Sequence, residues 1–311
     1  MNYIVLDLEW NQAEGKSHKR LAFEIIEIGA IKLDSEKRVI GKFNELIKPK
    51  VYSYINRVTR SLIHIKMEEL QKGISFVEAM NKFLKWCGDD YIFCTWGSLD
   101  LLELQRNMKY YKMKPLSQGP IAFLDVQKLF SRQYEDKVSR RTLEYAVDFL
   151  HIEKDIPFHR AYSDAYYTVK VLNKISKETE KHISFDVFNT PKNKKHEIQV
   201  VFDDYTKYIT REFSSKLSIM NDKEIVSTRC YKCGKNLPKI QKWFTPNGKH
   251  YYCICKCPIH GYMKGKIRVR KTEKDNVYAI KTLKLISQQE MEEILLKKER
   301  ASIKRKRKRN N

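Results

Sequence analysis

YIVLDL, at residues 3–8, is a run of apolar and β-branched side chains that predicts a buried strand near the start of the chain. Two further strands are expected at 24–33 (EIIEIGAIKL) and at 39–47, with a charged turn between them. The same criteria predict two short strands farther along, at 91–95 (YIFCT) and 121–125. The chain therefore begins with three consecutive strands.

Helical patterns lie between and after these strands. Apolar residues at helical spacing predict an amphipathic helix at 75–87, and further helices are expected at 99–108, 126–134, 142–150 and 161–176. Three strands followed by alternating helix and strand predict an α/β fold with a partly antiparallel sheet. Beyond residue 180 we expect a linker at 189–195, a helix at about 204–220, a charged helix at 288–301 and a solvated, mobile basic run at 304–309.

The chain is long enough for two domains, or for one domain with a large appendage. We expect an α/β domain at 1–180 and a linker with a helical segment at 181–228. A small zinc-ribbon-like domain is expected at 229–272, and a charged helix with a basic tail at 273–311.

Positive charge is concentrated in the second half of the chain. Of the formal net charge of +23, residues 1–175 contribute 28 Lys and Arg against 23 Asp and Glu, and residues 176–311 contribute 33 against 15. A strongly basic segment behind a nearly neutral one predicts a unit that binds a polyanion, with nucleic acid as the favoured one. The alternative is solubility with weak, non-specific binding of RNA.

Cysteine usage and hydropathy indicate the compartment. No apolar run reaches the roughly 18–20 residues that cross a bilayer, and the first residues enter a strand rather than a signal peptide. Five of the seven cysteines lie between Cys230 and Cys257. This clustering predicts a metal site in a reducing compartment rather than a disulfide framework. We therefore expect a cytosolic protein that does not bind membranes.

Asp7 and Glu9 stand at the end of the first strand, on either side of Leu8. Because side chains alternate along a strand, both carboxylates lie on one face. Adjacent carboxylates repel each other unless they share a cation. A single Asp-x-Glu is usually a surface feature, but this one ends an apolar strand, where unpaired charge is unfavourable.

Three more residues are candidates for the same site. Asp100 follows the strand at 91–95 and opens the next helix, where it is either a site residue or a plain helix N-cap. Asp164 lies in the first turn of the helix that begins just after His159. This spacing lets Asp164 bind a metal ion while His159 reaches a water molecule from the side.

The order and spacing of these residues resemble the DEDD exonuclease superfamily, whose three motifs match Asp7-Leu8-Glu9, Trp96-Gly97-x-x-Asp100 and His159-x4-Asp164-Ala165. The tyrosine type of that superfamily would carry Tyr where this chain has Arg160, so His159 indicates the histidine type, DEDDh. Trp96-Gly97, together with Leu124-Asp125, looks most similar to the ERI-1-like and KapD-like branch. The resemblance covers roughly residues 1–176.

This resemblance implies an RNase H-like fold with a five-stranded mixed sheet, and two Mg²⁺ or Mn²⁺ ions. Asp7 would bridge the ions, Glu9 and Asp164 would hold the ion that carries the attacking water, and Asp100 would support the second ion. One ion lowers the pKa of the water and the other stabilises the leaving 3′ oxygen. His159 would take the proton of the water near neutral pH, and nucleoside 5′-monophosphates would be released.

Two residues near this set have other predicted roles. Asp125 lies close to the same end of the sheet and is predicted to be structural. Trp10 stands where eukaryotic ERI-1-like enzymes carry smaller residues, and it either stacks on a terminal base or fills the core.

The cysteine cluster contains two knuckles, Cys230-x-x-Cys233-Gly and Cys257-x-x-His260-Gly. Pairs with this spacing let backbone amides surround the ligands, and two such turns complete a tetrahedral zinc site. Cys255 is an alternative to Cys257. Because the protein fills all four positions, such a zinc ion would be structural. Nearby aromatic residues form either a base-stacking surface or the core of the segment: Trp243, Phe244, Tyr251 and Tyr252.

We therefore expect a metal-dependent 3′–5′ exonuclease that acts on single-stranded ends, with RNA favoured over DNA, and with a zinc-binding segment and a basic tail that raise its affinity. One alternative is a catalytically weak nucleic-acid-binding or regulatory protein that uses the zinc ribbon and tail. Another is a zinc-centred interaction module with an ancillary nuclease half. The presence of all five active-site residues favours the enzyme; the oligomeric state and the physiological substrate stay open.

Overall fold

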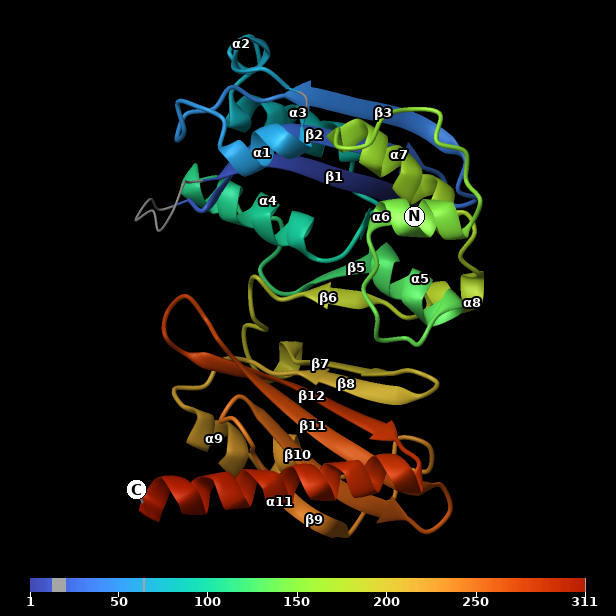
Figure 1. The fold of residues 1–311 in the computed structure, drawn as a ribbon, viewed down its shortest axis with the longest axis vertical. Coiled ribbons are helices and arrows are strands. Elements are labelled where there is room, and N and C mark those ends of the chain that lie inside the picture. The colour runs from blue at the N-terminus through green and yellow to red at the C-terminus, as the bar shows by residue number, and fades with distance from the viewer. Residues whose placement is uncertain (13–20, 64, 311) are drawn as a thin grey trace. The chain divides into compact units, whose positions relative to one another are not determined.

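The computed structural model describes residues 1–12, 21–63 and 65–310, and it divides the chain into two compact units, Met1–Phe188 and Asn189–Asn311 (Figure 1). The side chains of residues 304–310 lie outside the described part. Each unit has a sheet and a hydrophobic core of its own.

The first unit is built on a six-stranded mixed sheet in the order β3-β2-β1-β4-β5-β6. β1 pairs antiparallel with β2 and parallel with β4, so it is a central strand. The five predicted strands are confirmed, and the sheet gains the short strand β6, which was not predicted. The strands are β1 (Asn2–Gln12), β2 (Phe23–Leu33), β3 (Val39–Leu46), β4 (Tyr91–Thr95), β5 (Ile121–Asp125) and β6 (Ser184–Asp186).

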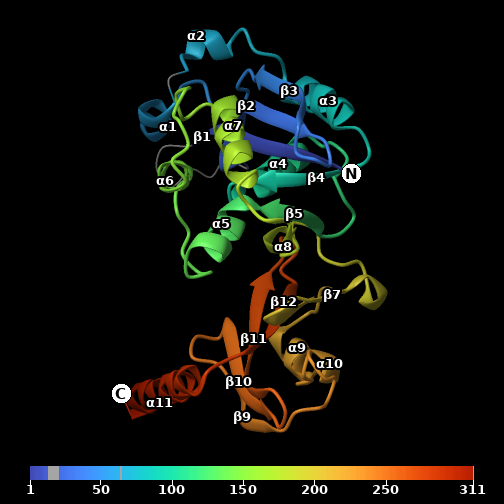
Figure 2. The same cartoon turned by 90° about the vertical axis from the view of Figure 1, so that its right-hand side faces the viewer.

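Helices cover both faces of this sheet (Figure 2). The helices α3 and α4 pack on one face, and α5, α6 and α7 pack on the other. The predicted helix at 161–176 ends at Leu172, and a separate short helix follows it. The helices of this unit are α1 (Arg57–Leu62), α2 (Met67–Leu70), α3 (Phe76–Cys87), α4 (Leu99–Tyr110), α5 (Val126–Tyr134), α6 (Leu143–Phe149), α7 (Ala161–Leu172) and α8 (Lys177–Glu180).

The side-chain alternation of β1 assigns its residues to two cores. Ile4, Leu6 and Leu8 pack with α3 and α4, whereas Val5 packs with the α5–α7 helices. Because alternate residues share a face, Asp7 and Glu9 follow Val5 on the side that α7 covers. The strand pattern therefore directs both carboxylates towards α7.

The second unit contains a fully antiparallel sheet in the order β7-β8-β12-β11-β10-β9. The short helices α9 and α10 lie on one face of this sheet, and α11 lies on the other (Figure 2). The elements are η1 (Lys194–His196), β7 (Ile198–Val201), β8 (Tyr205–Ile209), α9 (Lys216–Asn221), α10 (Lys223–Val226), β9 (Lys239–Phe244), β10 (His250–Cys257), β11 (Gly261–Lys271), β12 (Val277–Leu285) and α11 (Gln288–Asn310).

This unit differs from the sequence prediction in three ways. The helix expected at about 204–220 is wrong, because β8 and α9 occupy that segment. The expected divisions at 228 and 272 fall inside a single six-stranded unit, since the cysteine-bearing strands pair with β12 and β8. The basic run at 304–309, expected to be mobile, continues the backbone of α11, and its side chains lie outside the described residues.

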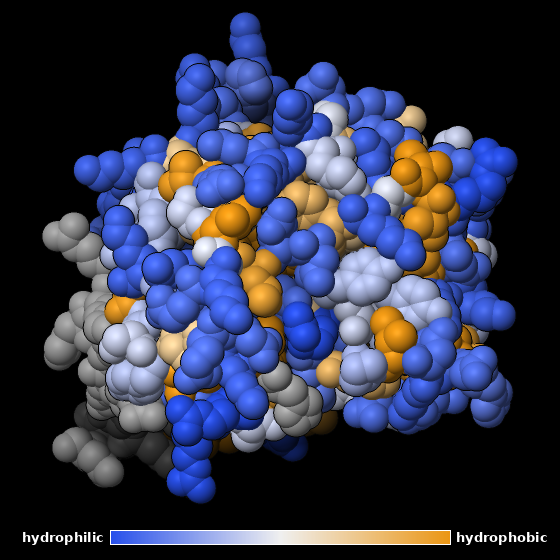
Figure 3. All heavy atoms as spheres, turned by 90° about the horizontal axis from the view of Figure 1, so that it is seen from above, coloured by the Kyte–Doolittle hydropathy of each residue, from blue (hydrophilic) through white to orange (hydrophobic). Residues whose placement is uncertain are grey.

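Hydrophobic residues on the face shown in Figure 3 form separate small patches among hydrophilic side chains. Scattered exposed apolar residues are normal on a protein surface and require no bound partner. Within the described residues, no helix combines the length and the apolar character that crossing a membrane requires.

Candidate active site and metal centre

Three acidic side chains converge at one edge of the first unit. Asp7 and Glu9 extend from β1, and Asp164 extends from the first turn of α7. Carboxylate oxygens of these three residues all lie within 4.8 Å of one another, and each residue is partly exposed. The structure therefore brings together two motifs that are more than 150 residues apart in the chain.

Asp100 lies beside this group but outside the 4.8 Å cluster. It is the second residue of α4, it is only 5% exposed, and its carboxylate accepts a hydrogen bond from the backbone N–H of Leu8. Because Leu8 separates Asp7 from Glu9, this bond ties Asp100 to the strand that carries them. The charge of Asp100 also raises the pKa of Asp7, after the larger effect of burial.

His159 is exposed and stands immediately before α7 in a left-handed backbone conformation, with φ of 65°. Its backbone N–H donates to Oδ1 of Asp164 at 3.3 Å. A non-glycine residue with positive φ costs on the order of 1–3 kcal/mol, and such strain is concentrated at functional sites. The strained turn and this hydrogen bond hold His159 next to the acidic group.

The carboxylates destabilise one another when they are charged. Burial and then repulsion from Asp164 raise the pKa of Glu9 to about 8. Burial and the neighbouring acids hold the pKa of Asp7 well above its usual value, and burial raises the pKa of Asp164 although the hydrogen bond from His159 opposes it. Among the described residues, no Lys or Arg forms an ion pair with these three carboxylates. Oxygen ligands in this electrostatic state fit a divalent cation.

A buried ion pair that the sequence patterns did not reveal anchors the start of α7. Glu27 of β2 is fully buried and lies opposite Glu9 in the β1–β2 register. The guanidinium of Arg160 donates to Glu27 through Nη2 at 2.8 Å and through Nε at 3.1 Å, and the Ala161 N–H donates to the same carboxylate at 3.2 Å. The sequence signal for this pair is weak: an acidic residue in the middle of a mostly apolar strand.

Gly29 permits the close approach of α7 to the sheet. It lies opposite Asp7 in the β1–β2 register. A Cβ atom at Gly29 would lie 2.1 Å from the backbone C of Ala161 and the backbone N of Tyr162, which is too close for any contact. Only glycine therefore lets the first turn of α7 pack against β2 at this distance, and Asp164 belongs to that turn.

Arg160→Ala is expected to destabilise the first unit by about 3 kcal/mol, because it leaves Glu27 buried and unpaired. This value lies at the lower end of the range for broken buried pairs, since the Arg160 side chain is 34% exposed. Glu27→Gln is the control: it keeps an acceptor for the Ala161 N–H and lets Arg160 turn towards water, so a loss of about 1 kcal/mol is expected. Urea denaturation measures both, and equal losses would contradict the proposed role of the pair.

Two neighbouring residues have structural positions. Trp10 is partly buried and packs against the core beneath α3 and α4, with its ring centroid 5.7 Å from that of Phe23, which favours the core-filling alternative. Asp125 is the N-cap of α5, where its side chain accepts a hydrogen bond from the Lys128 N–H at 3.0 Å. This position agrees with the structural role predicted for Asp125.

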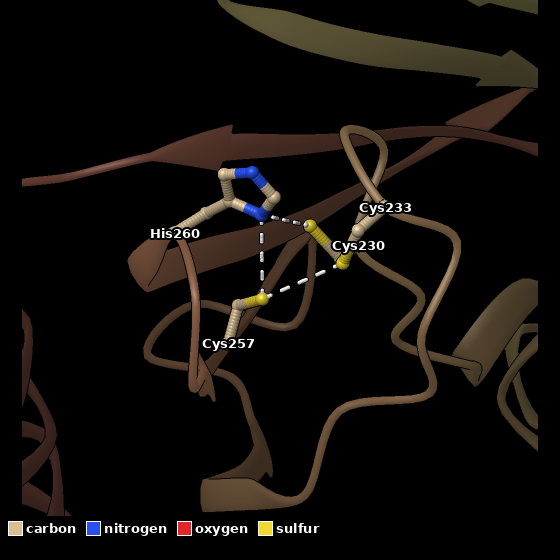
Figure 4. Close-up of side chains that lie close together, drawn as sticks. All are labelled: Cys230, Cys233, Cys257 and His260. Carbon is tan, nitrogen blue, oxygen red and sulfur yellow. Dashed lines mark hydrogen bonds between the residues drawn. The ribbon is translucent and has the colours of Figure 1, made fainter.

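A second cluster lies within the second unit and contains Cys230, Cys233, Cys257 and His260 (Figure 4). Their ligand atoms lie within 4.8 Å of one another. Nδ1 of His260 is 3.5 Å from Sγ of both Cys230 and Cys257. Burial opposes ionisation of Cys257, but hydrogen bonds from the backbone of His260 and Ile259 lower its pKa to about 6. A thiolate at neutral pH is the form that binds zinc.

Cys255 is not part of this cluster. Its thiol is buried and contacts the backbone oxygen of Met263 at 3.6 Å. Of the two cysteines that the sequence left as alternatives, the structure therefore places Cys257 beside Cys230, Cys233 and His260. The predicted aromatic residues divide between two faces: Trp243 and Tyr251 pack into the core with α9 and α10, while Phe244 and Tyr252 pack against each other outside that core.

Residues 4–172, more than half of the chain, match the model of the RNase_T family, which is described as exonuclease. Among solved structures, the nuclease domain of 3′hExo, a DEDDh family member bound to rAMP, is 19% identical, with 56% of this chain and 90% of that chain covered and a TM-score of 0.49. A 3′-exonuclease in a structure of histone mRNA stem-loop recognition is 16% identical, with 60% and 84% covered and a TM-score of 0.49. Escherichia coli exonuclease I in complex with a dT13 oligonucleotide is 16% identical, with 56% and 40% covered and a TM-score of 0.44. No curated protein matches the chain.

Proposed function

Because this chain belongs to the RNase_T exonuclease family, we propose that it is a metal-dependent 3′–5′ exonuclease of the DEDDh type, with an RNase H-like fold, for single-stranded nucleic acid ends. The observation that carries the proposal is the convergence of Asp7, Glu9 and Asp164 within 4.8 Å, with Asp100 and His159 beside them. RNA is proposed ahead of DNA because Trp96-Gly97 resembles the ERI-1-like branch.

In this proposal, Asp7, Glu9 and Asp164 would hold a pair of Mg²⁺ or Mn²⁺ ions, with Asp100 in support. When bound, two such ions supply activation of a water molecule and stabilisation of the leaving 3′ oxygen. The exposed imidazole of His159 accepts the proton of the attacking water. A bond forms between the water oxygen and phosphorus while the bond from phosphorus to the 3′ oxygen breaks. The leaving 3′ oxygen takes up a proton from solvent, so the products are a nucleoside 5′-monophosphate and a shortened strand that ends in a 3′ hydroxyl.

The second unit has a separate proposed role. Cys230, Cys233, Cys257 and His260 would hold a structural Zn²⁺ ion, because four protein ligands leave no position for water. The basic character of this unit and of its last helix would raise the affinity for nucleic acid.

The direct test is release of mononucleotides from matched single-stranded RNA and DNA labelled at the 3′ end, with Mn²⁺ as the cofactor. We expect labelled nucleoside 5′-monophosphate as the first product and faster release from RNA. Release from the 5′ end would refute the proposed direction. Tight binding without any release would favour the alternative of a catalytically weak nucleic-acid-binding protein.

Mg²⁺ is expected to raise the thermal midpoint of the first unit more at pH 8 than at pH 5. The folded-state pKa of Glu9 is about 8, against about 4.5 for an ordinary glutamate. The metal-free chain therefore loses stability as pH rises between these values, because the folded state retains a proton that the unfolded state releases. A cation that binds only the deprotonated carboxylates reverses this loss.

At a free Mg²⁺ concentration 100 times its Kd, the stabilisation is about 2.7 kcal/mol, which corresponds to about 5–10 °C for a unit of this size. Differential scanning fluorimetry at both pH values measures the shift. The experiment uses Mg²⁺ rather than Mn²⁺ because thiolates bind Mg²⁺ poorly. The cysteine cluster of the second unit should therefore not contribute to the shift. A shift that is equal at the two pH values, or larger at pH 5, would contradict a site made of these carboxylates.

A further inference from the structure

Strand β11 carries a row of cationic side chains on one face. Its residues alternate between buried positions and partly exposed or exposed ones along most of its length. The buried positions are Met263, Gly265, Ile267 and Val269, and the intervening ones are Lys264, Lys266, Arg268 and Arg270. Because alternate residues share a face, the four cations form a continuous stripe opposite the core of the second unit.

The end of this stripe lines a cavity of about 650 Å³, which we call the β10–β11 cavity. Arg268 lies opposite His250 in the β10–β11 register. Nζ of Lys216, from α9, donates to the backbone oxygen of Gly248 at 3.0 Å, which ties α9 to the turn before β10. The lining contains no acidic residue; it consists of Lys216, Lys249, His250, Arg268, Arg270 and Lys271, with two valines at 269 and 277.

Among the described residues, the lysines and arginines that line this cavity have almost no acidic partners. Over the part of the chain that the structure describes, no Asp or Glu pairs with Lys249, Arg268 or Arg270, and Lys271 contacts only the exposed Asp275 at 3.5 Å. The pKa of His250 is lowered by burial and then by surrounding cations, with Lys266 first among them. Unpaired positive charge gathered in a concave site attracts a polyanion.

An aromatic residue lies beside the cationic stripe, on the same face of the sheet. Tyr252 lies opposite Lys266 in the β10–β11 register. The ammonium groups of Lys266 and Lys297 lie 5.9 and 5.1 Å from the centroid of its ring. Cationic grooves with aromatic side chains beside them are typical of sites for single-stranded nucleic acid, because the cations follow the backbone and the rings stack on bases.

We propose that the β10–β11 cavity binds consecutive phosphates of a single-stranded nucleic acid, and so gives the second unit its own site for the substrate strand. The proposal deepens the proposed exonuclease function and rests on it, because that function identifies the anion as a nucleic acid. The volume of the cavity is in the range of ordinary ligand sites. Strands too short to reach both sites should not depend on the cavity.

The test is a double variant of the full chain, Arg268→Gln with Arg270→Gln. Lys192→Gln with Lys223→Gln is the matched control, because it removes the same charge from exposed positions of the same unit that do not line the cavity. Binding of a labelled oligonucleotide longer than about 16 nucleotides is measured by fluorescence anisotropy from about 50 to 200 mM salt, without added divalent ions. Thermal midpoints establish that each variant is folded.

The cavity variant should bind about 10-fold more weakly at low salt, and its slope of log K against log salt should fall by about 1.4, or 0.7 for each lost phosphate contact. The control should match the wild type. A cavity variant with the wild-type slope overturns the proposal. Complete displacement of the long strand by free nucleoside monophosphate or inorganic phosphate also overturns it, since the cavity would then bind a small anion.

Cleavage of a trinucleotide with Mn²⁺ separates this proposal from the proposed function. Wild type and both variants should cleave the trinucleotide at the same rate, because the altered residues lie in the second unit. A wild-type chain that neither cleaves nor binds any oligonucleotide refutes the exonuclease function itself. Normal cleavage with an unchanged salt slope refutes only the cavity.

Discussion

Asp7→Asn is expected to reduce the release of nucleotides by on the order of 1000-fold or more, while the chain stays folded. Carboxylate oxygens of Asp7, Glu9 and Asp164 lie within 4.8 Å of one another. Burial and then the charge of Asp100 raise the pKa of Asp7. Asp7 is therefore the central acid of the group. An amide retains the shape of the carboxylate but supplies no negative charge to a cation. The measurement is the single-turnover rate on a 3′-labelled oligomer with saturating Mn²⁺.

The stability of the metal-free chain should move in the opposite direction. Burial and neighbouring acids disfavour a charged Asp7, so a neutral amide at this position removes a repulsion. The thermal midpoint at pH 8 without divalent ions should therefore be equal to or higher than that of the wild type. A gain in stability with a loss of activity distinguishes removal of a functional group from simple unfolding.

Asp125→Asn is the matched control. Asp125 also ends a central strand, but its side chain caps α5, and asparagine is as good an N-cap as aspartate. Nucleotide release by this variant should stay close to that of the wild type. Wild-type activity in Asp7→Asn would remove the acidic cluster as the catalytic centre. Equal losses in both variants would show that any change at this edge of the sheet is harmful.

The acidic site was predictable because it depends on local periodicity. The apolar pattern before Asp7 predicted a strand, and alternation placed Glu9 on the same face. Asp100 and Asp164 each follow an element boundary that glycine, charge or helix spacing marks in the sequence. Short-range rules therefore sufficed to assign these residues to the ends of their elements. The resemblance to a family predicted that these ends meet in one site.

The residues that position this site were not predictable in the same way. The Glu27–Arg160 pair joins residues 133 positions apart, and no local rule indicates that a glutamate in a strand meets an arginine before a helix. Gly29 has no unusual backbone angle and is required only because the backbone of α7 packs against it. Both are consequences of tertiary contact between β2 and α7.

The second unit was harder to predict for a related reason. The segment at 205–209 forms a strand because it lies between β7, which directly precedes it in the chain, and β12, more than 70 residues later. Pairing on both sides, one of them distant, overrides local preference. The choice of Cys257 over Cys255 depends on position within β10. Cys257 is the last residue of the strand, where the chain turns to His260, whereas Cys255 lies inside the sheet.

Cys230→Ser is expected to abolish stoichiometric zinc binding and to unfold much of the second unit. Cys230 and Cys257 belong to a small buried cluster with Leu237, Met263 and Leu283, so the site is also a core. Structural zinc stabilises zinc-finger peptides by about 10–16 kcal/mol, and the loss here should be smaller because the sheet has a second core around α9 and α10. Metal analysis of the purified chain and the thermal unfolding profile measure the two effects.

Cys255→Ser provides the control, because it makes the same substitution at a buried cysteine two residues from Cys257. A serine hydroxyl there can donate to the Met263 backbone oxygen that the thiol now contacts, so zinc content should stay near one ion per chain. Loss of zinc in Cys255→Ser with retention in Cys257→Ser would reverse the ligand assignment.

The first unit has its own cores, so the Cys230→Ser variant should still cleave a trinucleotide when Mn²⁺ is present. Loss of that activity as well would show that the nuclease unit depends on the zinc-bearing unit for its stability, because none of the proposed catalytic residues belongs to the second unit.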